Sequence, residues 1–377
     1  LVGSEMCIRD SDYPNVDWQS SSANNIVLVE SGKQYKVLTL TDCFEYDEQT
    51  YNYYGSYSFT GTKIEQAVVT AILNVTTDDK VVVDMIKGNN EQDYSSLKTL
   101  LENNAYQVNE VSLATGDFDS NAKIAIMYAP SVDLDEKIVE KLSTWLSNDG
   151  KYGRSLIYVP TADMGEMPNL DDFLKEWGMS IDRGYVFETD ESTLVSASSP
   201  YAFTVSYGDY YKDNLKNSKI PVVVSESHAV NITDENTAHA LLKTSDKAGV
   251  LPIDADKNWD YKDAVSGNGE NVAAEGVMTN EDKNSSRVII FGSYVMFSDT
   301  IMKYNSFNNS AYFMNVINTI ADKEDVGITI ESKSIDNTEL GITDVATQNT
   351  MLVVFVIIIP IAILVAGFVF WLRRRNR

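Results

Sequence analysis

The amino-acid sequence predicts an α/β domain, with a mostly parallel sheet flanked by helices, followed by a C-terminal transmembrane helix. Strand-like and helix-like segments alternate along the first half of the chain, as they do where helices connect parallel strands. An uncharged run of 22 residues, Met351–Leu372, is long enough to cross a bilayer as a helix. The length of 377 residues, with 44% hydrophobic residues, suits about two folded domains of ~150 residues each.

The charge balance excludes one large class of partner. The chain has 30 Lys and Arg against 55 Asp and Glu, a formal net charge of −25. Four of the basic residues, Arg373, Arg374, Arg375 and Arg377, close the chain, so residues 1–372 hold 26 bases against 55 acids. Such a surface repels phosphate backbones, so we expect no nucleic-acid partner. With two Cys and two His in all, the sequence predicts no disulfide framework, no metal site and no cofactor.

The N-terminal residues are predicted to be foreign to the fold. Residues 1–11 lack an initiator Met and the apolar core of a signal peptide, and they resemble the translation of a sequencing adapter. We therefore expect an artefact there and a missing natural N-terminus. Residues 12–58 are predicted to be the remnant of a preceding domain. In it, Asn25–Leu40 has the signal of a β-hairpin, and the acidic, Tyr-rich stretch Asp42–Ser58 is predicted to be a loop.

Residues 59–332 are predicted to form an α/β domain outside the cytoplasm. Apolar periodicity and turn signals define its elements. The expected strands are Lys80–Ile86, Gln107–Leu113, Lys123–Ala129, Ser155–Val159, Pro221–Ser225, Arg287–Gly292 and Gly327–Ile330. The expected helices are Thr62–Leu73, Asp93–Asn103, Asp133–Leu146, Asn169–Trp177 (capped by Asn169 and ended by Gly178) and Ser310–Ala321. A loop-rich insertion is expected near 179–280, with a long polar loop at Lys257–Glu275.

The C-terminal segment predicts an anchor in the lipid bilayer. Residues 333–350 are polar and suit a linker, 351–372 are the predicted transmembrane helix, and 373–377 are a basic tail. Pro360 would kink the helix, and Trp371 lies where aromatic side chains anchor at the interface. Arg373, Arg374 and Arg375 place the tail in the cytoplasm by the positive-inside rule. The sequence thus predicts a cell-membrane protein with one visible span and an extracytoplasmic main domain.

One turn is a candidate binding site. Gly88, Asn89, Asn90 and Glu91 follow the first strand of the alternating series, at the carboxyl end where open α/β sheets place their sites. We interpret them as a ligand or partner loop with Glu91 as the polar contact, or as an ordinary strand-to-helix turn. The single glycine, preceded by Lys87, does not make a phosphate-binding loop.

The other chemistry-bearing residues do not form a predicted catalytic site. Cys43 is flanked by acids that would raise the pKa of its thiol. His228, at an expected strand end, and His239, in an expected helix, lack the spacing of a metal pair. Ser131 follows a strand, but the G-x-S-x-G pattern of a nucleophile elbow is absent around it.

Several segments, in order along the chain, carry a further signal. They are VESGKQYKVLTL, Phe59–Thr76 (FTGTKIEQAVVTAILNVT), KVVVDMIKGNNE, YAPSVDLDEKIVEKLSTWLSNDGK, RVIIFGSYVMFSD, NNSAYFMNVINTIA and the closing Leu340–Arg377. In this order they resemble the gliding-motility auxiliary (GldG-like) family of ABC transport systems. Thr62 stands where that family usually has Glu, and Asn89 and Asn90 replace the His and Gly of its Gly-His-Gly-Glu-like turn.

The resemblance implies a membrane-anchored auxiliary subunit that is not an enzyme. It would work with an ABC permease and a separate cytoplasmic ATPase. It also implies a fold similar to class I glutamine amidotransferases without their cysteine–histidine machinery. Two alternatives stay open. One is a surface adhesin or glycan-binding module, which predicts an aromatic platform at Tyr51–Tyr57. The other is an amidotransferase-like ectoenzyme, for which no positioned nucleophile and base are visible.

Overall fold

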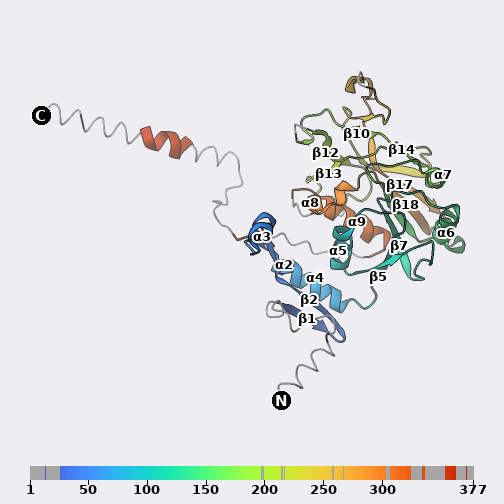
Figure 1. The fold of residues 1–377 in the computed structure, drawn as a ribbon, viewed down its shortest axis with the longest axis horizontal. Helices are drawn as coiled ribbons and strands as arrows, with labels where there is room; N and C mark the ends of the chain where they lie inside the picture. Colours follow the sequence, from blue (N-terminus) through green and yellow to red (C-terminus); the bar gives the residue numbers. More distant parts are fainter. Residues whose placement is uncertain are drawn as a thin grey trace, which may run out of the picture. The chain divides into compact units, whose positions relative to one another are not determined.

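The computed structural model describes two compact units of the chain (Figure 1). It describes residues 13, 26–196, 199–213, 215, 217–256, 259–265, 267–302, 306–323, 333–335, 353–361 and 371. The large unit comprises Leu1–Thr39 and Glu65–Glu331, and the small unit comprises Leu40–Ile64 and Ser332–Arg377. The predicted strand Gly327–Ile330 and the arginines after Trp371 lie outside the described residues.

The large unit is built on a ten-stranded mixed sheet. Its strand order is β11-β12-β15-β17-β18-β8-β7-β5-β6, with β13 also paired to β12. The strands are β5 (Val81–Ile86), β6 (Tyr106–Val111), β7 (Ala122–Tyr128), β8 (Ser155–Val159), β11 (Leu194–Ser196), β12 (Ser199–Tyr207), β13 (Val222–Ser225), β15 (Ala238–Lys243), β17 (Asn271–Thr279) and β18 (Ser285–Phe291). The pairs from β18 to β6 are parallel, and those from β11 to β18 are antiparallel. The α/β prediction is therefore confirmed, with a sheet that is parallel in one part only.

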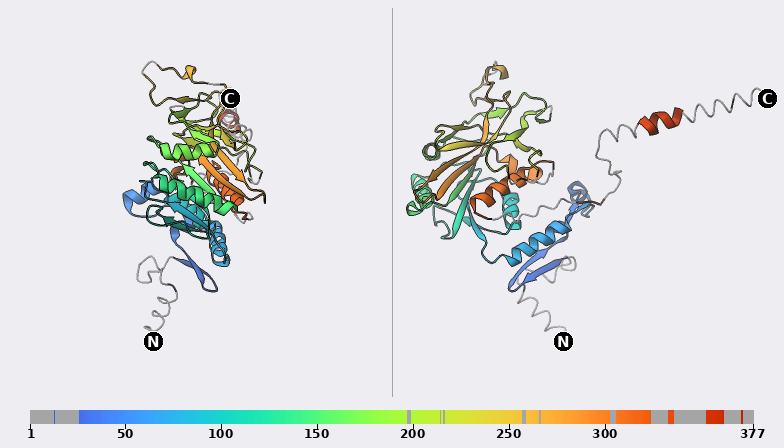
Figure 2. Two further views of the ribbon diagram at one scale, coloured as in Figure 1. Left: turned by 90° about the vertical axis from the view of Figure 1, so that its right-hand side faces the viewer. Right: turned by 180° about the vertical axis from the view of Figure 1, so that it is seen from behind.

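Helices cover both faces of this sheet because its central strands are apolar on both sides. Along β7, Ile124, Ile126 and Tyr128 face one core, and Ala125 and Met127 face the other. The first core packs against α5 (Ser95–Asn103) and α9 (Asn309–Ile320), and the second against α6 (Glu136–Ser147) and α7 (Pro168–Glu176). Figure 2 shows the two sets of helices on opposite faces.

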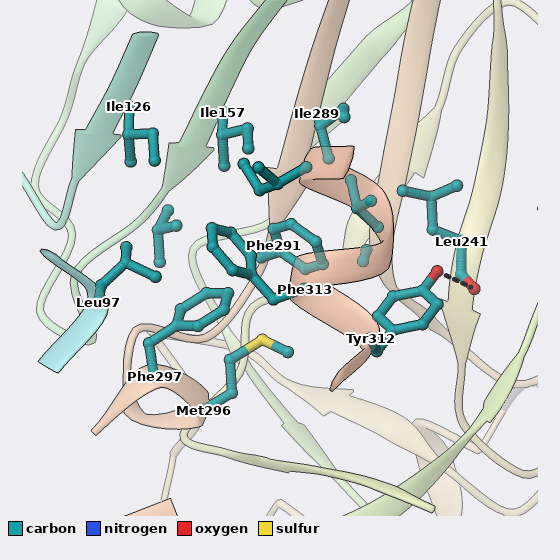
Figure 3. Packing of buried hydrophobic residues seen from close by; sticks show 14 of the residues in the cluster. Leu97, Ile126, Ile157, Leu241, Ile289, Phe291, Met296, Phe297, Tyr312 and Phe313 are labelled. Atoms are coloured by element: carbon teal, nitrogen blue, oxygen red, sulfur yellow. Dashed lines mark hydrogen bonds between the residues drawn. The ribbon is translucent and has the colours of Figure 1, made fainter. Parts of the chain in front are cut away.

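Aromatic rings fill the first core under the antiparallel part of the sheet (Figure 3). Phe291 at the end of β18 meets Phe297 and Phe313 at ring-centroid distances of 5.4 and 6.1 Å. The hydroxyl of Tyr312 on α9 donates a hydrogen bond of 3.3 Å to the carbonyl oxygen of Leu241. This packing makes β15 and β18 parts of one core rather than of separate lobes.

Most strands of the region near 179–280, predicted to be a loop-rich insertion, complete the central sheet. β12, β13, β15 and β17 belong to that sheet, and β17 begins inside the predicted polar loop Lys257–Glu275. Only short pairs lie apart from it: β9 (Met179–Ile181) with β14 (Val230–Ile232), and β10 (Tyr185–Phe187) with β16 (Gly249–Leu251). Of the central-sheet strands in this region, the sequence predicted β13, as Pro221–Ser225, whereas β12, β15 and β17 pair with partners distant in sequence and have an alternation broken by polar residues.

Helix α7 shows how a distant residue caps a helix. Asn169, the predicted cap, lies inside α7, which begins at Pro168. The backbone amides of Asn169 and Leu170 instead donate hydrogen bonds of 3.0 and 3.2 Å to the Asp133 carboxylate. Asp133 therefore satisfies two of the helix's free N–H groups from another part of the chain. At the other end the helix stops before Gly178, as predicted, and Gly178 has the left-handed φ of +72° that is common just after a helix.

The remaining predicted elements of the N-terminal part have mixed outcomes. The hairpin is confirmed as β1 (Val27–Ser31) and β2 (Gln34–Leu38), and the following helix as α4 (Ile64–Thr76). The predicted loop Asp42–Ser58 is wrong, because it contains α2 (Leu40–Cys43), β3 (Phe44–Tyr46) and α3 (Glu48–Tyr54). In the small unit, β3, β4 (Phe59–Thr62) and β19 (Lys333–Ser334) form a three-stranded antiparallel sheet, so the predicted linker 333–350 begins in a strand.

The apolar C-terminal run is described in part. Its described residues are 353–361, which begin with the π-helix η5 (Val353–Ile358), and Trp371. Within the stretches of chain that the structure describes, no helix reaches the length and apolarity needed to cross a membrane.

Candidate functional site

The parallel strands place one crevice at the carboxyl edge of the sheet. The chain leaves β5 through α5 to reach β6 on one side, and leaves β7 through α6 to reach β8 on the other. Helices α5 and α6 pack on opposite faces, so the direction of winding reverses between β5 and β7. In open α/β sheets ligands bind at such a reversal point. The predicted loop Gly88–Glu91 after β5 and the segment Ala129–Ser131 after β7 both lie there.

The turn after β5 is folded around the carboxylate of Glu91. Its two oxygens accept hydrogen bonds from the backbone amides of Gly88, at 3.0 Å, and Asn89, at 2.8 Å. Gly88 has φ +116° and Asn90 has φ +55°, so the turn uses the backbone freedom of glycine at its first residue. Two adjacent amides pointing at one site make an anion-binding nest. In this turn, Glu91 occupies that nest itself.

The two loops at the crevice are also joined to each other. The side-chain amide of Asn90 donates to the Ser131 hydroxyl at 2.6 Å, and that hydroxyl donates to the Asn90 carbonyl at 3.1 Å. The amide of Ser131 donates to the Asn89 carbonyl at 3.1 Å. The structure therefore brings all four predicted residues to the switch point and engages them in contacts within the chain. Their binding of a ligand or partner stays a prediction.

We expect Glu91→Ala to open this turn locally and to lower the free energy of unfolding by about 1 kcal/mol, because two backbone amides lose a charged acceptor. Hydrogen exchange should accelerate at the amides of Gly88 and Asn89, and denaturant unfolding gives the stability. Glu140→Ala, on the exposed side of α6, is the matched control and should change neither. Unchanged exchange at the two amides in Glu91→Ala would show that the Glu91 carboxylate does not hold the turn together.

A hollow of about 650 Å³ opens beside the crevice, between α5 and α8 (Asp299–Met302). Its lining combines aromatic and apolar side chains with hydroxyl, amide and carboxylate groups. The lining residues are Gln92, Asp93, Ser95, Ser96, Thr99, Leu100, Asn103, Tyr128, Tyr294, Phe297, Ser298, Asp299, Met302 and Ser310. The Tyr128 hydroxyl donates to the Tyr294 carbonyl at 2.8 Å, and burial raises its pKa, so this phenol acts as a neutral donor.

His228 is fully buried and connects three segments. Its Nδ1 lies 2.9 Å from the Gly184 carbonyl oxygen, and its Nε2 lies 3.0 Å from that of Thr161 in the loop after β8. Its ring stacks on Tyr185 at 5.6 Å. Both ring nitrogens face backbone acceptors, so the geometry is that of a structural link. The sequence pattern carried no signal of this role, because the two carbonyls belong to distant segments.

His239 belongs to a polar cluster around the buried carboxylate of Glu275. The prediction of a helix here is wrong, since His239 lies in β15 and faces Glu275 of β17. The fully buried Glu275 carboxylate lies 2.9 Å from His239 Nε2, accepts from Arg287 at 2.9 Å, and accepts from the Tyr211 hydroxyl at 2.6 Å. Burial alone would raise the pKa of Glu275, but the His239 contact, the Arg287 charge and the Tyr211 hydrogen bond outweigh it and lower that pKa.

Cys43 has the chemistry of an inert thiol. Its side chain is buried in the small unit, and burial raises the pKa of the thiol, with a further rise from the Asp42 charge and an opposing effect of Lys63. A raised pKa keeps the sulfur protonated and poorly nucleophilic. Over the described ranges, no three His, Cys, Asp or Glu side chains gather closely enough to hold a metal ion.

Comparison with known proteins gives likenesses in fold alone. No family model matches the sequence, and no curated protein matches it. The mmIFT52 N-terminal domain is similar with a TM-score of 0.47 and 14% identity, covering 65% of this chain and 99% of that domain. A glutamine amidotransferase from Thermotoga maritima gives a TM-score of 0.39 and 7% identity, covering 65% of this chain and 100% of that one. PurLQS from Thermotoga maritima gives a TM-score of 0.32 and 12% identity, covering 64% of this chain and 100% of that one.

Proposed function

We propose that this chain is a membrane-anchored auxiliary subunit, without ATPase activity, of an ABC-type transport system of the GldG-like kind. In this proposal the large unit acts outside the cytoplasm as a binding or scaffold domain for the permease. The observation that carries the proposal is the uncharged run Met351–Leu372 followed directly by arginines.

The described part of that run supports an apolar environment for it. Phe355 and Val356 are 63% and 64% exposed, and their neighbours Val353, Ile357, Ile358, Ile359 and Ile361 are all at least 41% exposed. A soluble protein rarely presents so continuous an apolar surface to water. Insertion in lipid would cover these side chains on every side, which contact along one face of a folded domain would not.

The side-chain contacts of the large unit support a binding role rather than a catalytic one. At the switch point the Ser131 hydroxyl is bonded to Asn90, and the Glu91 carboxylate is bonded to the backbone of its own turn. Both ring nitrogens of His228 face carbonyl oxygens. These groups are therefore held by contacts that maintain the fold, which fits an amidotransferase-like fold used as a scaffold.

The proposal is tested with the full-length chain in cells. We expect it to stay in the membrane fraction after an alkaline carbonate wash and, after mild solubilisation, to co-purify with a permease and an ATPase. An impermeant reagent on intact cells should label lysines of the large unit. Recovery of the chain in the soluble fraction, or without either partner, would contradict the proposal.

Ile359→Arg sharpens the test of the anchor. A charge near the centre of a spanning helix costs about 3 kcal/mol on insertion scales, so this variant should lose most of its membrane retention. Ile253→Arg is the matched control, because Ile253 is 71% exposed on the large unit and lies far from the run in sequence. Equal retention of the two variants would show that residues 351–372 do not anchor the chain.

A further inference from the structure

The small unit carries a cluster of seven aromatic side chains within sixteen residues. We call it the aromatic cluster, and its members are Phe44, Tyr46, Tyr51, Tyr53, Tyr54, Tyr57 and Phe59. They come from β3, from α3, and from the segment after α3 up to the first residue of β4. The sequence predicts a loop over most of this stretch, so only the fold shows how these rings are assembled.

Five rings of the cluster form a continuous series of contacts, and Tyr53 and Tyr54 form a separate pair. Tyr51 stacks on Tyr57 at 4.6 Å with 18° between the ring planes, and Tyr57 stacks on Phe59 at 5.8 Å with 5° between them. Tyr46 meets Tyr57 edge-on at 5.1 Å, and Phe44 meets Phe59 at 4.9 Å. Such pairs hold one another in place, so the cluster has a defined surface.

This surface faces solvent to an unusual extent. Tyr53 and Tyr54, which contact each other at 4.9 Å, are 83% and 73% exposed, while Tyr57 and Tyr51 are 42% and 36% exposed. Scattered exposed aromatics need no explanation, but a contiguous exposed group marks an interaction surface. The tyrosines combine an apolar ring with a polar hydroxyl, which is the composition favoured where hydrocarbon meets water.

The chain continues from this same small sheet toward the apolar run. Strand β19 pairs with β4, and the amide of Ile335 donates to the Thr60 carbonyl at 3.0 Å. Residues 336–350 separate this point from Met351, and fifteen residues span at most about 50 Å when fully extended. If the run is in the bilayer, the aromatic cluster is tethered within that distance of the membrane surface.

We propose that the aromatic cluster docks on the interface of the bilayer that holds residues 351–372, with Tyr53 and Tyr54 at the level of the lipid headgroups. This inference rests on the proposed membrane anchor. The acids Asp42, Glu45 and Asp47 around the cluster, against the base Lys63, favour a zwitterionic surface over an anionic one. Docking would hold the small unit against the membrane surface.

The test uses the full chain reconstituted in phosphatidylcholine vesicles. Ser56→Cys, an exposed position beside the cluster, carries a fluorophore in a Cys7→Ser, Cys43→Ser background, and lipids with a nitroxide on the headgroup serve as quencher. We expect strong quenching, and loss of most of it when Tyr53→Ser and Tyr54→Ser are combined. Ile253→Ser, which removes an exposed apolar side chain of the large unit, should leave the quenching unchanged. Vesicles with phosphatidylglycerol should give weaker quenching.

The outcomes separate this inference from the proposed function. If the chain floats with the vesicles but the label is unquenched, or is quenched equally in the double tyrosine variant, the docking inference is overturned while the anchor stands. If the chain fails to float, the anchor itself fails. If soluble oligosaccharides shift the label's emission without lipid and the tyrosine variant abolishes that shift, the cluster is a glycan site and the docking inference is overturned.

Discussion

Arg287→Met should lower the free energy of unfolding by about 3 kcal/mol, because removing one partner of a buried ion pair leaves the other charge buried and poorly compensated. Glu275 is fully buried and accepts hydrogen bonds from Arg287 at 2.9 Å and from Tyr211 at 2.6 Å. Tyr211 and His239 would remain beside the carboxylate, which keeps the loss at the lower end for such pairs. Denaturant unfolding followed by tryptophan fluorescence measures the change.

The neutral double variant is the control for that expectation. Glu275→Gln combined with Arg287→Met removes both charges, so it should be more stable than Arg287→Met alone. Strictly additive losses in this double-mutant cycle would mean that the pair is not coupled, contrary to the geometry.

The same cluster predicts a difference in pH dependence between the wild-type chain and Glu275→Gln. The folded state lowers the pKa of Glu275, so its stabilising contribution is full above the unfolded pKa of about 4.3 and is lost as the pH falls through the folded value. The stability difference between the wild-type chain and Glu275→Gln should therefore shrink below about pH 4. A difference that stays constant down to acid unfolding would contradict the lowered pKa.

His228→Leu should lower the free energy of unfolding by about 1–3 kcal/mol, because at least one buried carbonyl oxygen loses its hydrogen-bond donor. The two oxygens that face the ring nitrogens belong to Gly184 and Thr161, and His228 is fully buried between them. A neutral imidazole donates from one nitrogen and a protonated one from both, whereas leucine donates from neither. The loss of the ring also removes the stacking on Tyr185.

His228→Gln is the informative companion, since its amide retains donor hydrogens of similar reach. It should recover part of the stability lost in His228→Leu, as read from thermal and denaturant unfolding. If leucine were tolerated as well as glutamine, the two carbonyls would not depend on His228, and the link between the three segments would have to come from packing alone.

The sequence predicted the parallel part of the sheet well because its signals are local. Strands β5, β7 and β8 are short apolar runs, and helices α5, α6 and α7 after them each have a periodic apolar face. The prediction of strand Ser155–Val159 agrees with β8 at both ends. The turn Gly88–Glu91 was found in the same way, because a polar, glycine-containing turn after a buried strand is visible without any knowledge of its neighbours.

In the antiparallel part, that reasoning found β13 and β18 but neither the other strands nor the polar clusters. Glu275 looked like the end of a polar loop, and His239 like part of a helix, because neither residue's neighbours in sequence reveal its partners. Tyr211 lies 64 residues before Glu275, and Thr161 lies 67 residues before His228. The cap of α7 by Asp133 likewise joins segments 36 residues apart.

By itself, the sequence determined the acidic surface, the uncharged run with its terminal arginines and the α/β alternation, because composition, hydropathy and periodicity are properties of neighbouring residues. The tertiary structure alone decided which carboxylates and histidines are buried together, how the switch-point loops bond to each other, and which aromatic rings of residues 44–59 contact one another. The buried polar contacts depend on long-range strand pairing, which brings distant residues together only when the large sheet has formed.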